Sequence, residues 1–154
     1  METIGILGGM GPEASATFYN MIIDICHKKY NAQQDTDYPP MIIYSLPLEG
    51  FDETGIVDEE KVLLQLIKGI KVLESSGSDF IVITCNTVHC FIDDLRKNVK
   101  IPILSIIEET SKKLKSDKIN SVGLLASETT FELDIYGKIL EKNKLKVINP
   151  NKEE

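Results

Sequence analysis

One cysteine in the sequence stands where a reactive thiol would be useful. Cys85 follows the apolar run Phe80–Thr84 and begins a polar Cys-Asn-Thr segment. The run indicates a buried strand, and a helix is expected after it. Backbone N–H groups and the helix dipole at such a position lower the pKa of a thiol, so we predict a thiolate that can act as a base on a small substrate. Asn86 and Thr87 offer polar groups that could bind a carboxylate beside it. The competing interpretation is a buried structural cysteine, which is common.

A second candidate feature is the glycine loop Gly8–Gly11. Glycines let the backbone approach a ligand closely. Gly9, Gly11 and Ala14 also match the loose G-x-G-x-x-A form of a dinucleotide-binding loop. Ser45 stands where an acidic residue would bind a ribose, so a nucleotide cofactor is not expected. The alternative is a tight strand-to-helix turn without a ligand.

The histidines and the cysteines are also candidate metal ligands. The five residues are Cys26, His27, Cys85, His89 and Cys90. Cys85 and His89 are one helical turn apart and could share a face. Neither group has the spacing of a zinc site, so no metal is expected and packing roles are favoured.

Composition excludes several other functions. Among the 154 residues, 17 Lys and Arg face 24 Asp and Glu, which gives a net charge of −7. This charge disfavours a nucleic-acid partner. No signal peptide or membrane span is visible, and three cysteines without a disulfide spacing indicate a reducing, cytoplasmic location.

Strands alternate with helices along the chain. This pattern predicts an α/β fold with a parallel sheet and helices on both faces, a three-layer sandwich. Ligands of such sheets bind beyond the carboxyl ends of the strands, where the loops 8–11, 46–57 and 85–87 meet. The predicted strands are Thr3–Leu7, Met41–Ser45, Phe80–Thr84, Ile101–Ile107 (strand or extended), Val122–Ala126 and Leu145–Ile148, and the predicted helices are 12–30, 58–77, 88–98, 110–115 and 130–142.

Several segments together resemble the aspartate/glutamate racemase family. "IGILGGMGPEAS" at residues 4–15 and "VITCNTVH" at 82–89 are the most specific. "DTDYPP", "IPILSIIEET" and "GLLASETTFELDIY" follow the family in the same order and at similar spacing, so the resemblance covers nearly the whole chain.

The resemblance implies two pseudo-symmetric, flavodoxin-like halves, usually a homodimer, a small acidic amino-acid substrate and no cofactor. Two cysteines would flank the substrate α-carbon, one thiolate removing a proton and one thiol returning a proton to the opposite face. We expect residues 1–100 to form the first half, with the first catalytic cysteine, and residues 101–154 to form an incomplete second half.

The resemblance also assigns roles to individual residues. Cys85 matches the first catalytic cysteine. Met10 matches a residue that lines the substrate site, and Asn86 and Thr87 match carboxylate-binding positions. Thr130 matches a threonine that faces the ligand from the second half.

Two family features are missing from this sequence. The second cysteine, in a Gly-Cys-Thr-Glu turn, is absent, and Cys26 and Cys90 are not expected to replace it. Residues 46–57 contain no Arg or Lys to bind a side-chain carboxylate. We therefore expect weak or absent racemase activity. The alternatives are a non-catalytic domain that binds small carboxylates and a related one-cysteine decarboxylase or isomerase, of which Cys85 makes the decarboxylase the less favoured.

Overall fold

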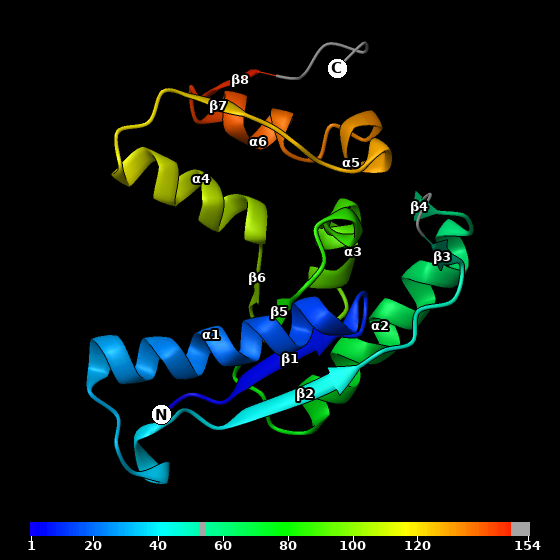
Figure 1. The fold of residues 1–154 in the computed structure, drawn as a ribbon. Helices are drawn as coiled ribbons and strands as arrows, with labels where there is room; N and C mark the ends of the chain where they lie inside the picture. Colours follow the sequence, from blue (N-terminus) through cyan, green and yellow to red (C-terminus); the bar gives the residue numbers. More distant parts are fainter. Residues whose placement is uncertain (53–54, 149–154) are drawn as a thin grey trace.

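A four-stranded parallel sheet forms the centre of the molecule. The computed structural model describes residues 1–52 and 55–148 (Figure 1). The strand order is β2-β1-β5-β6, and Ile4 of β1 pairs with Met41 on one side and with Phe80 on the other. The sheet confirms the predicted α/β class. Its strands are β1 (Ile4–Gly8), β2 (Met41–Ser45), β5 (Phe80–Ile83) and β6 (Ile103–Leu104).

Helices lie on both faces of this sheet. α1 (Pro12–Tyr30) covers one face, and α2 (Glu59–Ser75) lies against the other (Figure 1). From β1 the chain moves to β2 on one side, and it then crosses back past β1 to β5 on the other side. Because both crossovers are right-handed, α1 and α2 lie on opposite faces of the sheet. The short helices η1 (Asp35–Asp37), η2 (Thr87–Phe91) and α3 (Ile92–Arg96) complete this part of the fold. The predicted helix at 88–98 is therefore a 3-10 turn followed by a short α-helix.

The main core lies between the sheet and α2. Leu7, Leu66, Ile70 and Ile81 are fully buried there. Asp58 is the N-cap of α2, as predicted, and its side chain accepts a hydrogen bond from the N–H of Lys61 at 3.0 Å. This cap satisfies one of the free N–H groups of the first turn.

The last third of the described chain forms a separate layer. α4 (Ile106–Ser116) begins earlier than predicted because Ser105 caps it by accepting from the N–H of Glu108 at 3.4 Å. β7 (Ser121–Gly123) and β8 (Lys146–Ile148) pair in parallel with each other, so the six predicted strands do not form one sheet. β6 lies after residue 100 and still joins the first sheet, so a division into halves, which stays a prediction, would fall better between β6 and α4.

The predicted single helix at 130–142 is wrong. The structure has α5 (Glu128–Glu132) and α6 (Gly137–Lys142), separated by Asp134 at φ +47°. A Cβ at Gly137 would lie 2.0 Å from Oδ1 of Asp134, so the chain turns tightly against itself here. A residue in the left-handed region ends a helix, which explains the break.

The predicted loop 46–57 also contains structure. β3 (Phe51–Asp52) and β4 (Gly55–Ile56) form a two-stranded antiparallel pair, and β4 contacts α5. The loop thereby joins the first sheet to the last third of the chain. The predicted strand at 122–126 is shorter in the structure, because β7 ends at Gly123. None of the helices within the described ranges combines the length and hydrophobicity needed to cross a lipid bilayer.

Candidate active site

A cavity of about 370 Å³ lies at the carboxyl ends of β1 and β5. Segments far apart in the sequence line it, from the glycine loop to the segment between β7 and α6. It brings together all five residues that the sequence predicts for the site: Met10, Cys85, Asn86, Thr87 and Thr130. Their placement agrees with the prediction, and their chemical roles stay predictions.

The glycine loop is held by one buried serine. The Ser15 hydroxyl accepts a hydrogen bond from the N–H of Gly9 at 3.0 Å and donates to the carbonyl of Gly11 at 3.2 Å. Its oxygen also lies 2.9 Å from Oγ1 of Thr84, the residue before Cys85. Ser15 therefore connects the loop after β1 to the turn after β5. It lies inside the quoted "GGMGPEAS" segment, but nothing in the sequence shows that its partner is Thr84.

The loop turns at Gly9 because no other residue fits there. Gly9 has φ +95°, and a Cβ on it would lie 2.5 Å and 2.6 Å from the backbone O and N of Leu46. The N–H of Leu46 donates to the carbonyl of Gly8 at 2.9 Å, so β1 and β2 continue to pair beyond their ends. This packing points the following residue, Met10, into the cavity, where it is 8% exposed.

Cys85 is half-buried and lines the cavity. Burial raises the pKa of its thiol, and hydrogen bonds from the backbone N–H groups of Val88 and Thr87 lower that pKa by less. The predicted donors are present, but the predicted direction is wrong because desolvation disfavours the thiolate more than the donors favour it. At neutral pH Cys85 is therefore a neutral thiol, and two backbone N–H groups are in place to donate to the thiolate when it forms.

The buried side chain of His89 links the cysteine turn to α4. It is 2% exposed, and both ring nitrogens have partners. Nδ1 donates to the carbonyl of Cys85 at 2.7 Å, and Nε2 accepts from the N–H of Ile106 at 3.2 Å. Burial lowers the pKa of this histidine, so the ring is neutral and its tautomer is fixed. His89 thus joins the cysteine turn to the N-terminus of α4, which agrees with the packing role expected for it.

Three hydroxyl groups connect the two sides of the cavity. The Oγ1 atoms of Thr87 and Thr130 lie 3.2 Å apart, and Ser127 Oγ lies 3.0 Å from Thr130 Oγ1. Thr87 and Thr130 are 7% and 2% exposed. Their hydrogen bonds to each other place both hydroxyls at the cavity wall.

The other described residues of the cavity wall are apolar or uncharged. Phe51, Leu124 and Leu125 supply apolar surface. None of the described residues that line this cavity carries a charge. A carboxylate in this site would therefore be bound by neutral N–H and O–H donors.

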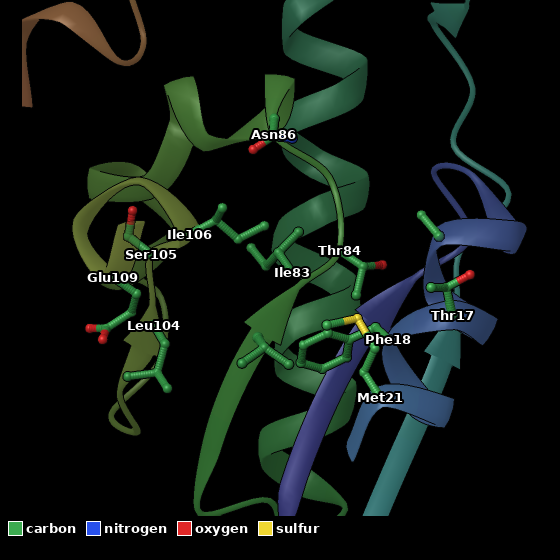
Figure 2. Close-up of a pocket in the computed structure, with 12 residues that line it drawn as sticks. Thr17, Phe18, Met21, Ile83, Thr84, Asn86, Leu104, Ser105, Ile106 and Glu109 are labelled. Carbon is green, nitrogen blue, oxygen red and sulfur yellow. The ribbon is translucent and has the colours of Figure 1, made fainter. Parts of the chain in front are cut away.

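A second, more apolar cavity of about 440 Å³ adjoins the first. Figure 2 shows Phe18 and Met21 of α1 on one side, Leu104 and Ile106 on the other, and Ile83 between them. Ala14, Thr84 and Asn86 line both cavities. Among the described residues that line the second cavity, Glu109 has the sole ionisable side chain, and there is no cysteine.

The other two cysteines do not line the candidate site. Cys26 is buried on α1, 7% exposed. Cys90 lies at the surface, and partial burial beside the negative charge of Glu59 raises its pKa to about 11. Neither thiol faces Cys85 across the cavity, as expected from the sequence. Over residues 1–52 and 55–148, no group of three His, Cys, Asp or Glu side chains is arranged to hold a metal ion.

The parallel sheet and the cysteine turn at its carboxyl edge agree with the comparison to known families. Residues 7–154 match the Asp/Glu/Hydantoin racemase family, and the chain belongs to it. This match confirms the resemblance to amino-acid racemases that the sequence motifs indicate.

Several individual proteins of known name are similar to this chain. The broad specificity amino-acid racemase RacX of Bacillus subtilis is 38% identical over 146 residues, which are 95% of this chain and 63% of RacX. The crystal structure of an aspartate racemase homologue from Pyrococcus horikoshii superposes with a TM-score of 0.86 at 34% identity, over 99% of this chain and 66% of that one. The aspartate racemase of Picrophilus torridus gives 0.82 at 28% identity, over 99% and 64%. The chain thus spans slightly less than two-thirds of these relatives.

Proposed function

We propose that this protein acts on the α-carbon of a free amino acid by thiol-based proton transfer, as a cofactor-independent amino-acid racemase or half of one. The observation that supports this proposal most directly is the cavity in which Cys85 lies beside Asn86, Thr87 and Thr130. Abstraction of an α-proton requires a base next to groups that donate hydrogen bonds to the substrate carboxylate.

In the proposed reaction, the Cys85 thiolate takes the α-proton. The C–H bond breaks, its electron pair remains on the α-carbon and delocalises into the carboxylate, and the proton is bound by Sγ. Donors at the carboxylate stabilise the added negative charge. The N–H groups of Thr87 and Val88 stabilise the thiolate before it reacts.

Inversion needs a second acid on the opposite face of the substrate. In the part of the chain that the structure describes, no second thiol lines the cavity. The proton on Cys85 therefore returns to the face it left. We expect exchange of the α-proton with solvent, and little or no racemisation, from the 154-residue chain.

The side chain of the substrate is a separate question. Aspartate or glutamate is the prediction from the sequence, but the described lining residues are uncharged and offer a side-chain carboxylate no cationic partner. RacX, the Bacillus subtilis relative, is named for broad specificity. Neutral amino acids therefore belong in the test beside the acidic ones.

We further propose a cytoplasmic location, where the thiols stay reduced, and a homodimer.

The test is α-proton exchange in D₂O, followed by NMR. The purified chain is incubated with the L- and D-forms of aspartate, glutamate, alanine and methionine. We expect loss of the α-proton signal from one enantiomer, and abolition of this loss by Cys85→Ala. Cys90→Ala is the matched control, because this cysteine lies outside the cavity and should leave exchange unchanged. A folded wild-type chain that exchanges none of these amino acids contradicts the proposal.

A second candidate function is a binding domain for small carboxylates without turnover. The raised pKa of Cys85 favours it, because a neutral thiol is a poor base. Binding of an amino acid without exchange, up to about pH 9.5, a full unit above the ordinary thiol pKa, would favour this candidate over the racemase.

A further inference from the structure

A tyrosine from the last third of the chain reaches the cysteine turn. Tyr136 immediately precedes α6, and its hydroxyl donates a hydrogen bond of 2.6 Å to Oδ1 of Asn86. Fifty positions separate the two residues in the sequence. Both line the candidate active site.

This hydrogen bond fixes the orientation of the Asn86 side-chain amide. A side-chain amide has an oxygen that accepts and an NH₂ group that donates, and rotation by 180° exchanges them. With Oδ1 held by Tyr136, the NH₂ group has no protein partner among the described residues. A substrate carboxylate only accepts hydrogen bonds, so the free NH₂ group is the edge that it needs.

We propose that Tyr136 is a positioning residue for the substrate carboxylate: by holding the oxygen of Asn86, it presents the amide NH₂ group as a donor to the carboxylate. This inference rests on the proposed function, since it concerns the same cavity. Either hydroxyl can be the donor in the Thr87–Thr130 contact, whereas the NH₂ group of Asn86 can only donate.

The hydroxyl of Tyr136 is suited to this task under the conditions of the reaction. Burial raises the pKa of Tyr136 above its ordinary value. The hydroxyl therefore keeps its proton at neutral pH, and it continues to donate to Asn86.

A merely structural role would be the alternative. The Thr87–Thr130 and Ser127–Thr130 contacts hold the same two segments together without Tyr136. Removal of the tyrosine oxygen should therefore change the orientation of Asn86 more than it changes the fold.

The experiment compares Tyr136→Phe, Asn86→Ala and the double variant. KM and kcat are measured for α-proton exchange, and protection of Cys85 from iodoacetamide by alanine or aspartate measures binding without turnover. Loss of one neutral hydrogen bond should raise KM, and the concentration that protects Cys85, by about three- to tenfold, with kcat within about twofold. The double variant should match Asn86→Ala alone. Tyr30→Phe, at an exposed tyrosine on α1, is the matched control and should change nothing.

Two results would overturn the inference. One is a Tyr136→Phe variant with unchanged KM and unchanged protection. The other is a double variant whose losses add, which would mean that Tyr136 acts without Asn86. Protection separates this inference from the proposed function: protection without exchange refutes catalysis and leaves Tyr136 testable, whereas a wild-type Cys85 that no amino acid protects refutes the positioning role as well.

Discussion

The glycine loop allows a sharp prediction about stability. In Gly9→Ala, the new methyl group faces two separate costs. The backbone at φ +95° is unfavourable for any residue with a Cβ, and the Cβ itself would lie 2.5 Å from the carbonyl oxygen of Leu46. The obstacle is backbone in a paired region beside β2, so it cannot rotate away as the end of a side chain can.

The two costs can be estimated separately. A positive φ costs a residue with a Cβ about 1–2 kcal/mol. An overlap that forces the backbone to shift costs about 1–3 kcal/mol. We therefore expect Gly9→Ala to lower the free energy of unfolding by about 2–5 kcal/mol.

Two other glycines serve as controls. Gly77 has φ +93°, and a Cβ added there would have no neighbouring atom within 4 Å, so Gly77→Ala tests the φ cost alone, about 1–2 kcal/mol. Gly123 has an ordinary φ, and the nearest neighbour of an added Cβ would lie at 4.0 Å, so Gly123→Ala should stay within about 0.5 kcal/mol of wild type.

Urea unfolding, followed by far-ultraviolet circular dichroism, measures all three variants. The order of destabilisation should be Gly9, then Gly77, then Gly123. If Gly9→Ala costs no more than Gly77→Ala, the close approach to Leu46 is not what requires glycine in this loop.

Three further predictions concern titration and the buried polar links. Because burial raises the pKa of Cys85, kcat/KM for α-proton exchange should keep rising above the ordinary thiol range, and a plateau below about pH 7.5, under that range, would refute this. His89→Phe should cost about 2–4 kcal/mol in urea unfolding, because it leaves the carbonyl of Cys85 and the N–H of Ile106 unpaired; a cost below about 1 kcal/mol would mean that water replaces the ring. Glu108 accepts two hydrogen bonds of 2.9 Å from Arg96, which lower the pKa of Glu108. At about pH 7, Glu108→Gln should therefore lower the free energy of unfolding by about 0.5–1 kcal/mol, a range that allows for the partial exposure of the pair. This difference from wild type should disappear as the pH falls through the lowered pKa of the Glu108 carboxyl. A difference from wild type that does not shrink as the pH falls below the ordinary glutamate pKa of about 4.3 would contradict that assignment.

The elements that the sequence predicts well are those with local signals. Pro12 begins α1, and Asp58 caps α2, because a fixed φ and a short acceptor side chain act on the nearest turn. The break between α5 and α6 is not predicted. It depends on Asp134 in the left-handed region and on the space around Gly137, and an isolated glycine in a helical pattern is only a weak sign of such a break.

The candidate site is predictable in its members but not in its connections. Cys85 and its polar neighbours are found because the turn after an apolar strand is where parallel sheets bind ligands. Ser15 and Tyr136 are not found, because their partners lie 69 and 50 residues away. The direction of the Cys85 pKa is missed for a related reason: the N–H donors are local to the turn, whereas the burial comes from the whole fold.

The order of the strands has a consequence for how the protein is made. β1 leaves the ribosome before β2 and β5, yet it ends in the interior of the sheet, between those two strands. Ile4 pairs on both edges only after Met41 and then Phe80 have been synthesised. Until Ile83 emerges, a nascent chain therefore carries an apolar strand with an open edge, which is a substrate for chaperones and a risk for aggregation. The strand that pairs with this edge ends two residues before Cys85, so the nascent protein completes its main core and its cysteine turn at nearly the same moment of synthesis.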